Sequence, residues 1–275
     1  MNEDKYMNLR NRAETSQEAF LRLWEIIKVL RRECPWDKEQ TYESLVPCML
    51  EEAYEAVDAV SKKDMTNLRE ELGDVMLQVL MNSAIAEENG DFMLISVIND
   101  ECEKMIRRHP HIFLEESIKS VDKVLEKWEN IKSKEKGTTT QTSVLENVPR
   151  ALPALTRGYK IQKKAADVGF DWDDVSGAFQ KIKEETEELL AASVSDNHIS
   201  IKDEVGDLLF SVVNVARFLK VDPEQALSEA TDKFIRRFSY IERTAKERGQ
   251  ILNDMTIEEM DKLWDEAKLL EKLSK

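Results

Sequence analysis

Two halves of the 275-residue chain carry the same acidic pattern at the same spacing. Each half reads Glu-Glu-x-x-Glu followed by Glu-x-x-Asp. Nineteen residues separate Glu52 from Glu71, and nineteen also separate Glu185 from Glu204. The surrounding segments are similar as well, since ELGDVMLQV begins at Glu71 and EVGDLLFSV begins at Glu204. Similarity at a fixed offset indicates a repeated structural unit, so we expect two copies of one domain.

The apolar residues recur with the roughly 3.6-residue period of amphipathic helices in both halves. Only eight Gly and six Pro occur in the chain, which leaves few tight turns between strands. The sequence therefore predicts an all-α fold of two tandem repeated helical-bundle domains. The predicted helices span 16–32, 43–61, 65–88, 94–108 and 118–135 in the first half, and 153–166, 175–193, 199–219, 223–248 and 256–273 in the second.

The predicted domain boundary is the segment KGTTTQTS at 136–143, which lacks an apolar period. Pro149 and Pro153 flank the point where helical periodicity resumes. We expect an N-terminal domain over 1–135, a linker over 136–150 and a C-terminal domain over 151–275.

The balance of charges limits the classes of partner. Forty basic and fifty-five acidic residues give a net charge of -15, which disfavours binding to a nucleic-acid polymer. The three cysteines form no C-x-x-C motif, so we expect neither a disulfide framework nor a zinc site. A reducing cytoplasm fits this pattern, and no apolar stretch is long enough to cross a membrane.

The acidic motifs place carboxylates three residues apart on one helical face. Glu185 pairs with Glu188 in this way, and Glu204 pairs with Asp207 on the next helix. The second helix should turn an apolar stripe toward the core, which leaves its two carboxylates at the helix-helix seam. This stripe comprises Val205, Leu208, Leu209, Val212, Val213 and Ala216.

Four converging carboxylates need a counter-charge. Two unit charges about 4 Å apart interact by about 4 kcal/mol at an effective dielectric near 20. Oxygen ligands without Cys or His select Mg²⁺, or alternatively Mn²⁺, over zinc. One acidic pair in a chain with 35% charged residues is usually a solvated helix face. Two pairs on successive helices, repeated at identical spacing, favour a metal site.

Basic pairs four residues apart also occur in both halves. Lys104 with Arg108 and Lys233 with Arg237 each share a helical face. Such pairs neutralise phosphate oxygens, although the alternative of a solvated basic face stays open.

Motifs along nearly the whole chain resemble the MazG-type nucleoside triphosphate pyrophosphohydrolases of the all-α NTP pyrophosphatase superfamily. The first half contributes CPWDKEQT at 34–41, LEEAYEAVDA at 50–59, ELGD at 71–74 and RRHPHIF at 107–113. The second half contributes LPAL at 152–155, KIQKKAADVGFDW at 160–172, EVGDLLF at 204–210 and KFIRRF at 233–238. Within the GFDW segment we expect Phe170 and Trp172 to be packing residues.

This resemblance implies catalytic and metal-binding roles for the second-half carboxylates. Mg²⁺ would be held by Glu185, Glu188, Glu204 and Asp207, while Glu184 would orient or deprotonate the attacking water. By similarity, the nucleotide would contact Lys181, Lys233, Arg237, Trp264 and Lys268. A second candidate site in the N-terminal domain comprises Glu51, Glu52, Glu55, Glu71, Asp74, Lys104, Arg108, Trp128 and Lys132.

The resemblance further implies Mg²⁺-dependent hydrolysis of NTPs or dNTPs to nucleoside monophosphate and pyrophosphate. We expect broad specificity and a role in nucleotide-pool cleanup, with the C-terminal domain as the main catalytic half. The long apolar stripes suggest a homodimer. The alternatives are a narrow specificity, as for dUTP, dCTP or phosphoribosyl-ATP, and a noncatalytic nucleotide-binding helical scaffold.

Overall fold

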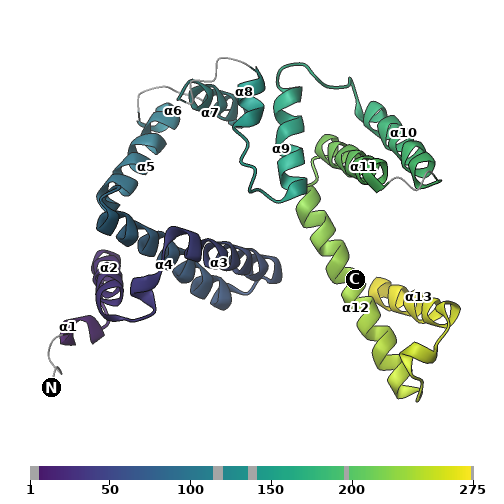
Figure 1. Ribbon diagram of the computed structural model, residues 1–275, viewed down its shortest axis with the longest axis horizontal. Coiled ribbons are helices and arrows are strands. Elements are labelled where there is room, and N and C mark those ends of the chain that lie inside the picture. Colours follow the sequence, from purple (N-terminus) through teal and green to yellow (C-terminus); the bar gives the residue numbers. More distant parts are fainter. Residues whose placement is uncertain (1–5, 114–119, 136–140, 195–197, 274–275) are drawn as a thin grey trace. The chain divides into compact units, whose positions relative to one another are not determined.

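The computed structural model describes residues 6–113, 120–135, 141–194 and 198–273 (Figure 1). These residues fold into helices joined by turns, without a strand among them, so the predicted all-α class is confirmed. The helices group into two compact units, Met1–Lys132 and Ser133–Lys275. Residues 136–140 of the expected linker lie outside the described residues, and a short helix, α8 (Gln141–Glu146), occupies part of its remainder.

Unit 1 is built around an antiparallel hairpin of two long helices, α3 and α4. Lys63 ends the first helix in the left-handed conformation, with φ of 57°. Asp64 then caps the second by accepting hydrogen bonds from the backbone N–H groups of Thr66 and Asn67. The elements of unit 1 are α1 (Met7–Arg10), α2 (Ser16–Glu33), η1 (Asp37–Glu39), α3 (Tyr42–Lys62), α4 (Met65–Asn89), α5 (Leu94–Arg108), α6 (Pro110–Phe113) and α7 (Val121–Glu135).

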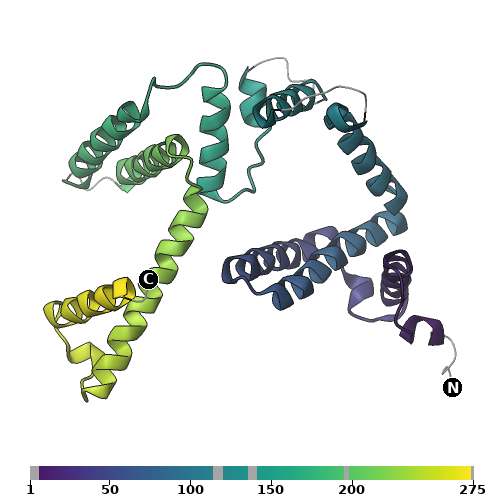
Figure 2. The same cartoon turned by 180° about the vertical axis from the view of Figure 1, so that it is seen from behind.

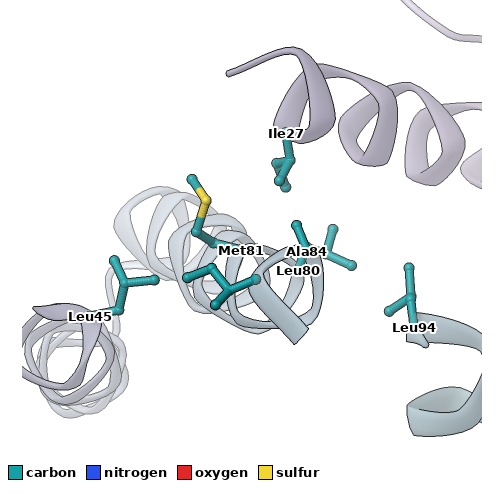
Figure 3. Close-up of a cluster of buried hydrophobic side chains, with 7 residues drawn as sticks. Ile27, Leu45, Leu80, Met81, Ala84 and Leu94 are labelled. Atoms are coloured by element: carbon teal, nitrogen blue, oxygen red, sulfur yellow. The ribbon is translucent and has the colours of Figure 1, made fainter. Parts of the chain in front are cut away.

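The core of unit 1 lies where α2, α3 and α5 meet the C-terminal half of α4 (Figure 3). Met81 and Ala84 of α4 are buried in this cluster, together with Ile27 of α2. Leu45 of α3 and Leu94 of α5 complete it from the other helices. Close packing of this kind leaves little free volume, so the interior of unit 1 is filled by aliphatic side chains.

Unit 2 repeats the hairpin as α10 and α11, which lie side by side in both views (Figures 1 and 2). Helix α9 packs on α11, and α13 packs on α12. Asp222 caps the N-terminus of α12, whose first residue is Pro223. The elements of unit 2 are α8, α9 (Ala154–Ala166), α10 (Val175–Val194), α11 (His198–Phe218), α12 (Pro223–Glu247), η2 (Leu252–Asp254) and α13 (Ile257–Leu273).

The apolar stripe of α11 differs from the sequence-based expectation. Val213 is buried, but Val205, Leu209 and Val212 are 40%, 50% and 46% exposed. The physical reason is that α11 has apolar residues on two faces, and α9 and α10 cover only one of them. The outward face of α4 carries a similar row, at positions 133 residues earlier: Leu72, Met76 and Val79.

None of the helices formed by the described residues combines the length and apolar content of a membrane-spanning segment.

Candidate active site

The α10–α11 hairpin brings acidic side chains together at its seam. Carboxylate oxygens of Glu185, Glu204 and Asp207 all lie within 4.8 Å of one another. Those of Glu184, Glu185 and Glu188 form a second group within the same limit. Glu185 belongs to both groups, so the carboxylates of the two helices form one continuous cluster.

Glu185 is the centre of this cluster. Its side chain is only 4% exposed, and Oε1 lies 2.5 Å from Nζ of Lys181, one turn earlier on α10. The same ammonium group lies 2.8 Å from Oε1 of Glu184. These two carboxylates raise the pKa of Lys181, with the hydrogen bond to Glu184 as the largest cause. The other oxygen of Glu185, Oε2, is buried and has no hydrogen-bond partner among the described residues.

The chemistry of the cluster fits a hard divalent cation. Burial raises the pKa of Glu188, and the neighbouring charges of Glu185 and Glu204 raise it further. Ligand oxygens on opposite sides of Mg²⁺ lie about 4 Å apart, a spacing compatible with the groups described above. The buried, unsatisfied oxygen of Glu185 is a further ligand atom in need of a positive partner.

A cavity of about 350 Å³ opens beside the carboxylates, between α9, α10, α11 and the segment that joins α9 to α10. Lys181, Glu185 and Asp207 line it on one side. Its volume falls in the range of small-molecule sites, roughly 300–1,000 Å³. The remaining lining residues are Leu145, Ile161, Gln162, Ala165, Phe170, Asp171, Trp172, Phe210, Ser211, Asn214 and Arg217.

The two aromatic residues of the GFDW segment form part of this lining. They were expected to be packing residues, but Phe170 is 83% exposed and Trp172 is 45% exposed. The segment is tied to α11 by Asp171, whose Oδ1 lies 2.5 Å from Nη2 of Arg217. The ion pair therefore holds an aromatic wall over the cavity.

The sequence-based analysis missed the polar wall of the cavity. Gln162, Ser211 and Asn214 are all buried, although residues of these types usually lie at the surface. Each lies on a helical face with apolar neighbours, where a buried polar residue is unusual. Polar residues among apolar neighbours were the signal in the sequence that could have identified this wall.

The predicted basic and aromatic residues of α12 and α13 form a separate group. Arg237 donates two hydrogen bonds to Glu271, and its guanidinium carbon lies 5.3 Å from the ring centroid of Trp264. Lys268 lies 3.2 Å from Asp265, and Lys233 is exposed. None of these four is among the residues that line the cavity.

Unit 1 has a corresponding acidic cluster. Carboxylate oxygens of Glu52, Glu55 and Glu71 lie within 4.8 Å of one another. Burial is the largest cause that raises the pKa of Glu71, and the charge and hydrogen bond of Glu55 follow. The pKa of Glu52 is raised by burial and by the charges of Asp74, Glu55 and Glu51. The unit 1 motifs therefore converge as those of unit 2 do.

The basic and aromatic residues predicted for the second site lie on α5 and α7. Lys104 forms an ion pair with Glu101 on α5, and Arg108 lies in the last turn of that helix. On α7, the ring of Trp128 lies 6.1 Å from that of His109, and Lys132 follows one turn later.

The two units differ in what lies beside the carboxylates. Because the acidic motifs are offset by 133 residues, the equivalents of the cavity residues can be found in unit 1. There Met81 replaces Asn214, Ala84 replaces Arg217 and Cys48 replaces Lys181. The first two replacements belong to the hydrophobic core. Unit 1 thus keeps the acidic cluster and has core residues at two of the positions that line the cavity in unit 2, whereas the buried Gln78 corresponds to Ser211.

Comparison with known proteins places both acidic clusters in one type of domain. The family described as the MazG nucleotide pyrophosphohydrolase domain matches residues 40–113 and 175–241. These two segments contain the acidic motifs of unit 1 and unit 2 respectively.

Several relatives match most of the chain. A Thermotoga maritima protein described as nucleoside triphosphate pyrophosphohydrolase/pyrophosphatase MazG is 41% identical, over 92% of this chain and 98% of its own length. An Escherichia coli K12 protein described as nucleoside triphosphate pyrophosphohydrolase is 41% identical, over 86% of this chain and 90% of its own. The Bacillus subtilis uncharacterized protein YabN is 50% identical over 90% of this chain, which spans about half, 51%, of that relative.

Proposed function

The chain belongs to the MazG nucleotide pyrophosphohydrolase family, and on this basis we propose that it hydrolyses nucleoside triphosphates to nucleoside monophosphate and pyrophosphate. The observation that carries the proposal for this chain is the position of the cavity. It adjoins the cluster of carboxylates on one side and presents aromatic and amide side chains on the other.

In this proposal Glu185, Glu188, Glu204 and Asp207 hold Mg²⁺, with Mn²⁺ as an alternative. The ion, when bound, supplies positive charge that offsets the triphosphate and acidifies water at neutral pH. The buried Oε2 of Glu185 supports this assignment, because it gains a partner when a cation is present. Glu184 is an exposed member of the cluster and would orient the attacking water or take its proton.

Lys181 has a distinct role in the proposed reaction. The residue lines the cavity, and its ammonium group pairs with Glu184 and Glu185. The carboxylates keep the ammonium group protonated. It can therefore leave these partners and bind a phosphate oxygen as a compact positive charge. The triphosphate would then span the carboxylates, with the nucleoside inside the cavity.

The exposed apolar rows on α4 and α11 support a homodimer. Residues at i, i+4 and i+7 form a continuous helical stripe, and both units present such a stripe at equivalent positions. We propose that a second copy of the chain covers these stripes, because contiguous apolar surface of this kind marks an association site. Lys233, Arg237, Trp264 and Lys268 would act on the nucleotide in that assembly.

We further propose that unit 2 carries the main activity. Unit 1 has the acidic cluster, but core residues take the place of the amide and guanidinium groups that line the cavity of unit 2. We also propose broad specificity and a role in nucleotide-pool cleanup, and the aromatic and amide groups in the cavity lining support the breadth of specificity. The three free cysteines agree with a cytoplasmic setting.

The test is a panel of NTPs and dNTPs incubated with the protein and Mg²⁺. Release of nucleoside monophosphate and pyrophosphate is expected from several bases, and nucleoside diphosphate with inorganic phosphate would contradict the proposed bond cleavage. Turnover of a single substrate such as dUTP, dCTP or phosphoribosyl-ATP would establish the narrow alternative. Nucleotide binding without any turnover would establish the scaffold alternative.

A further inference from the structure

Two buried amide side chains face the cavity with fixed orientations. Gln162 of α9 and Asn214 of α11 are 8% and 7% exposed, and both line the cavity. Neither belongs to the acidic motifs or to the basic cluster of α12 and α13. A buried amide is costly unless each of its polar atoms has a partner, so their free atoms indicate what the cavity receives.

The protein fixes which end of the Gln162 amide is free. Nε2 donates a hydrogen bond of 2.8 Å to the backbone carbonyl oxygen of Phe210. A carbonyl oxygen can only accept, so the amide cannot be flipped without loss of this bond. Oε1 is then left as an acceptor, and it has no hydrogen-bond partner among the described residues.

Asn214 is fixed in the opposite sense. Its Oδ1 accepts a hydrogen bond of 2.8 Å from Nε of Arg217, and a guanidinium group can only donate. The Nδ2 amide group is therefore the end that remains to donate. Phe210 and Asn214 are one helical turn apart on α11, so the carbonyl that holds Gln162 lies next to the asparagine. The wall thus has one acceptor, from Gln162, and one donor, from Asn214, on side chains that meet the same turn of α11.

We propose that Gln162 and Asn214 recognise the hydrogen-bonding edge of the nucleobase, with Oε1 accepting from a base N–H and Nδ2 donating to the adjacent base acceptor. This inference rests on the proposed function of the cavity. Trp172 and Phe170, on the segment tied to α11 through Asp171, supply flat apolar faces against which the base stacks. Enzymes that enclose a single base commonly combine such stacking with hydrogen bonds to its edge.

An acceptor next to a donor suits every common base. Adenine and cytosine present an amino N–H beside a ring nitrogen, and guanine, uracil and thymine present a ring N–H beside a carbonyl. The pair therefore requires a base edge without choosing among the bases, which gives a physical reason for broad specificity. A base that lacks the N–H donor leaves Oε1 of Gln162 buried without a partner.

The test compares ATP with purine riboside triphosphate, which lacks the amino group. For the wild-type chain, kcat/KM for pyrophosphate release should be about tenfold higher with ATP. In Gln162→Met, the KM for ATP should rise by roughly tenfold with kcat little changed, and the two substrates should become nearly equivalent. Equal use of both substrates by the wild-type chain would overturn the inference, whether or not the variant folds.

Gln78→Met is the matched control. Gln78 of α4 is 7% exposed and its Oε1 also lacks a partner among the described residues, but it does not line the cavity. This variant should keep the wild-type preference for ATP. If Gln162→Met instead removes a preference between ATP and dATP, Oε1 contacts the ribose and the assignment to the base is wrong.

Calorimetric titration with AMP and purine riboside monophosphate separates this inference from the proposed function. If the chain binds AMP about tenfold more tightly than purine riboside monophosphate but releases no pyrophosphate from ATP, base recognition is supported and the proposed hydrolysis is contradicted. If the chain hydrolyses both triphosphates equally well and binds both monophosphates equally, the proposed hydrolysis is supported and base recognition is contradicted.

Discussion

The indole ring of Trp172 lies against Gly177 in the first turn of α10. A Cβ atom at residue 177 would be 2.4 Å from Cδ1 and 2.5 Å from Cγ of this ring, far inside van der Waals contact. Only glycine therefore allows the indole to hold this position. Because Trp172 lines the cavity, the absence of a side chain on α10 determines where one wall of the cavity stands.

Gly177→Ala should displace Trp172 and lower kcat/KM for pyrophosphate release by roughly 10- to 100-fold, since misplacement of a substrate-positioning group has effects of that order. Steady-state kinetics with ATP would measure it. Gly73→Ala is the control, because a Cβ there meets no atom within 4 Å. It should leave the kinetics unchanged and stabilise α4 by about 0.5–1 kcal/mol. Wild-type kinetics for Gly177→Ala would show that Trp172 does not contact the substrate.

Glu185→Gln should reduce kcat by roughly 100-fold or more, because even groups that only support a metal ligand contribute 10- to 100-fold. The substitution preserves size and removes the charge at the centre of the unit 2 cluster. Glu52→Gln makes the same change 133 residues earlier and should retain most of the activity. Pyrophosphate release by both variants provides the measurement. Similar losses from the two substitutions would contradict the assignment of the main activity to unit 2.

Divalent cations should stabilise the chain, and more strongly at neutral than at acidic pH. The pKa values of Glu71 and Glu188 are raised in the folded chain, above the ordinary 4.5. The folded state therefore binds these protons more tightly than the unfolded state. The resulting stability is present below the ordinary pKa and is lost as the pH rises through the raised values.

Scanning calorimetry in EDTA should accordingly show a Tm that falls as the pH rises above the ordinary carboxylate range. Mg²⁺ should raise the Tm again at neutral pH. At a concentration 100-fold above its Kd, the ion should add about 2.7 kcal/mol to the free energy of unfolding. In Glu185→Gln the effect of Mg²⁺ should shrink, because one site has lost its central ligand. A Tm that is independent of Mg²⁺ at neutral pH would rule out cation binding at either cluster.

Leu209→Glu should weaken the proposed homodimer. The residue is 50% exposed in the middle of the α11 stripe, and a buried unpaired carboxylate costs several kcal/mol. Sedimentation over a range of concentrations should show dimer for the wild-type chain and a shift toward monomer for the variant. Ile257→Glu is the control, since this exposed residue lies in the first turn of α13, where a negative charge is favourable. A monomeric wild-type chain would refute the proposal.

Periodicity predicted the long helices because each has one face that must be buried. The expected helix over 94–108 coincides with α5, and the ends of α2, α4 and α10 differ from prediction by one residue. The short helices α1, α6 and α8 were missed. A single turn of helix has too few residues to show a period.

The convergence of the unit 2 carboxylates could be predicted because spacing along a helix determines which residues share a face. The cavity could not, because its polar wall depends on how α9 packs against α11. Nothing in the local sequence around Gln162 indicates that its amide meets the carbonyl of Phe210. The exposed apolar face of α11 was not predicted for a related reason. Val205 is exposed and Val213 is buried, but a sequence does not show which apolar face of a helix its neighbours cover.

The aliphatic core of unit 1 limits which residues can stand on α4 beside its carboxylates. Three carboxylates of unit 1 converge, while Met81 and Ala84, at the positions of Asn214 and Arg217, belong to its core. Hollowing out Met81 and Ile27 to admit a nucleoside would create a void in the packing that supports α2 and α4, and large-to-small changes at such sites commonly cost about 2–5 kcal/mol each. Folding stability therefore opposes the replacement of these core residues by the polar residues that unit 2 has at the positions of Met81 and Ala84.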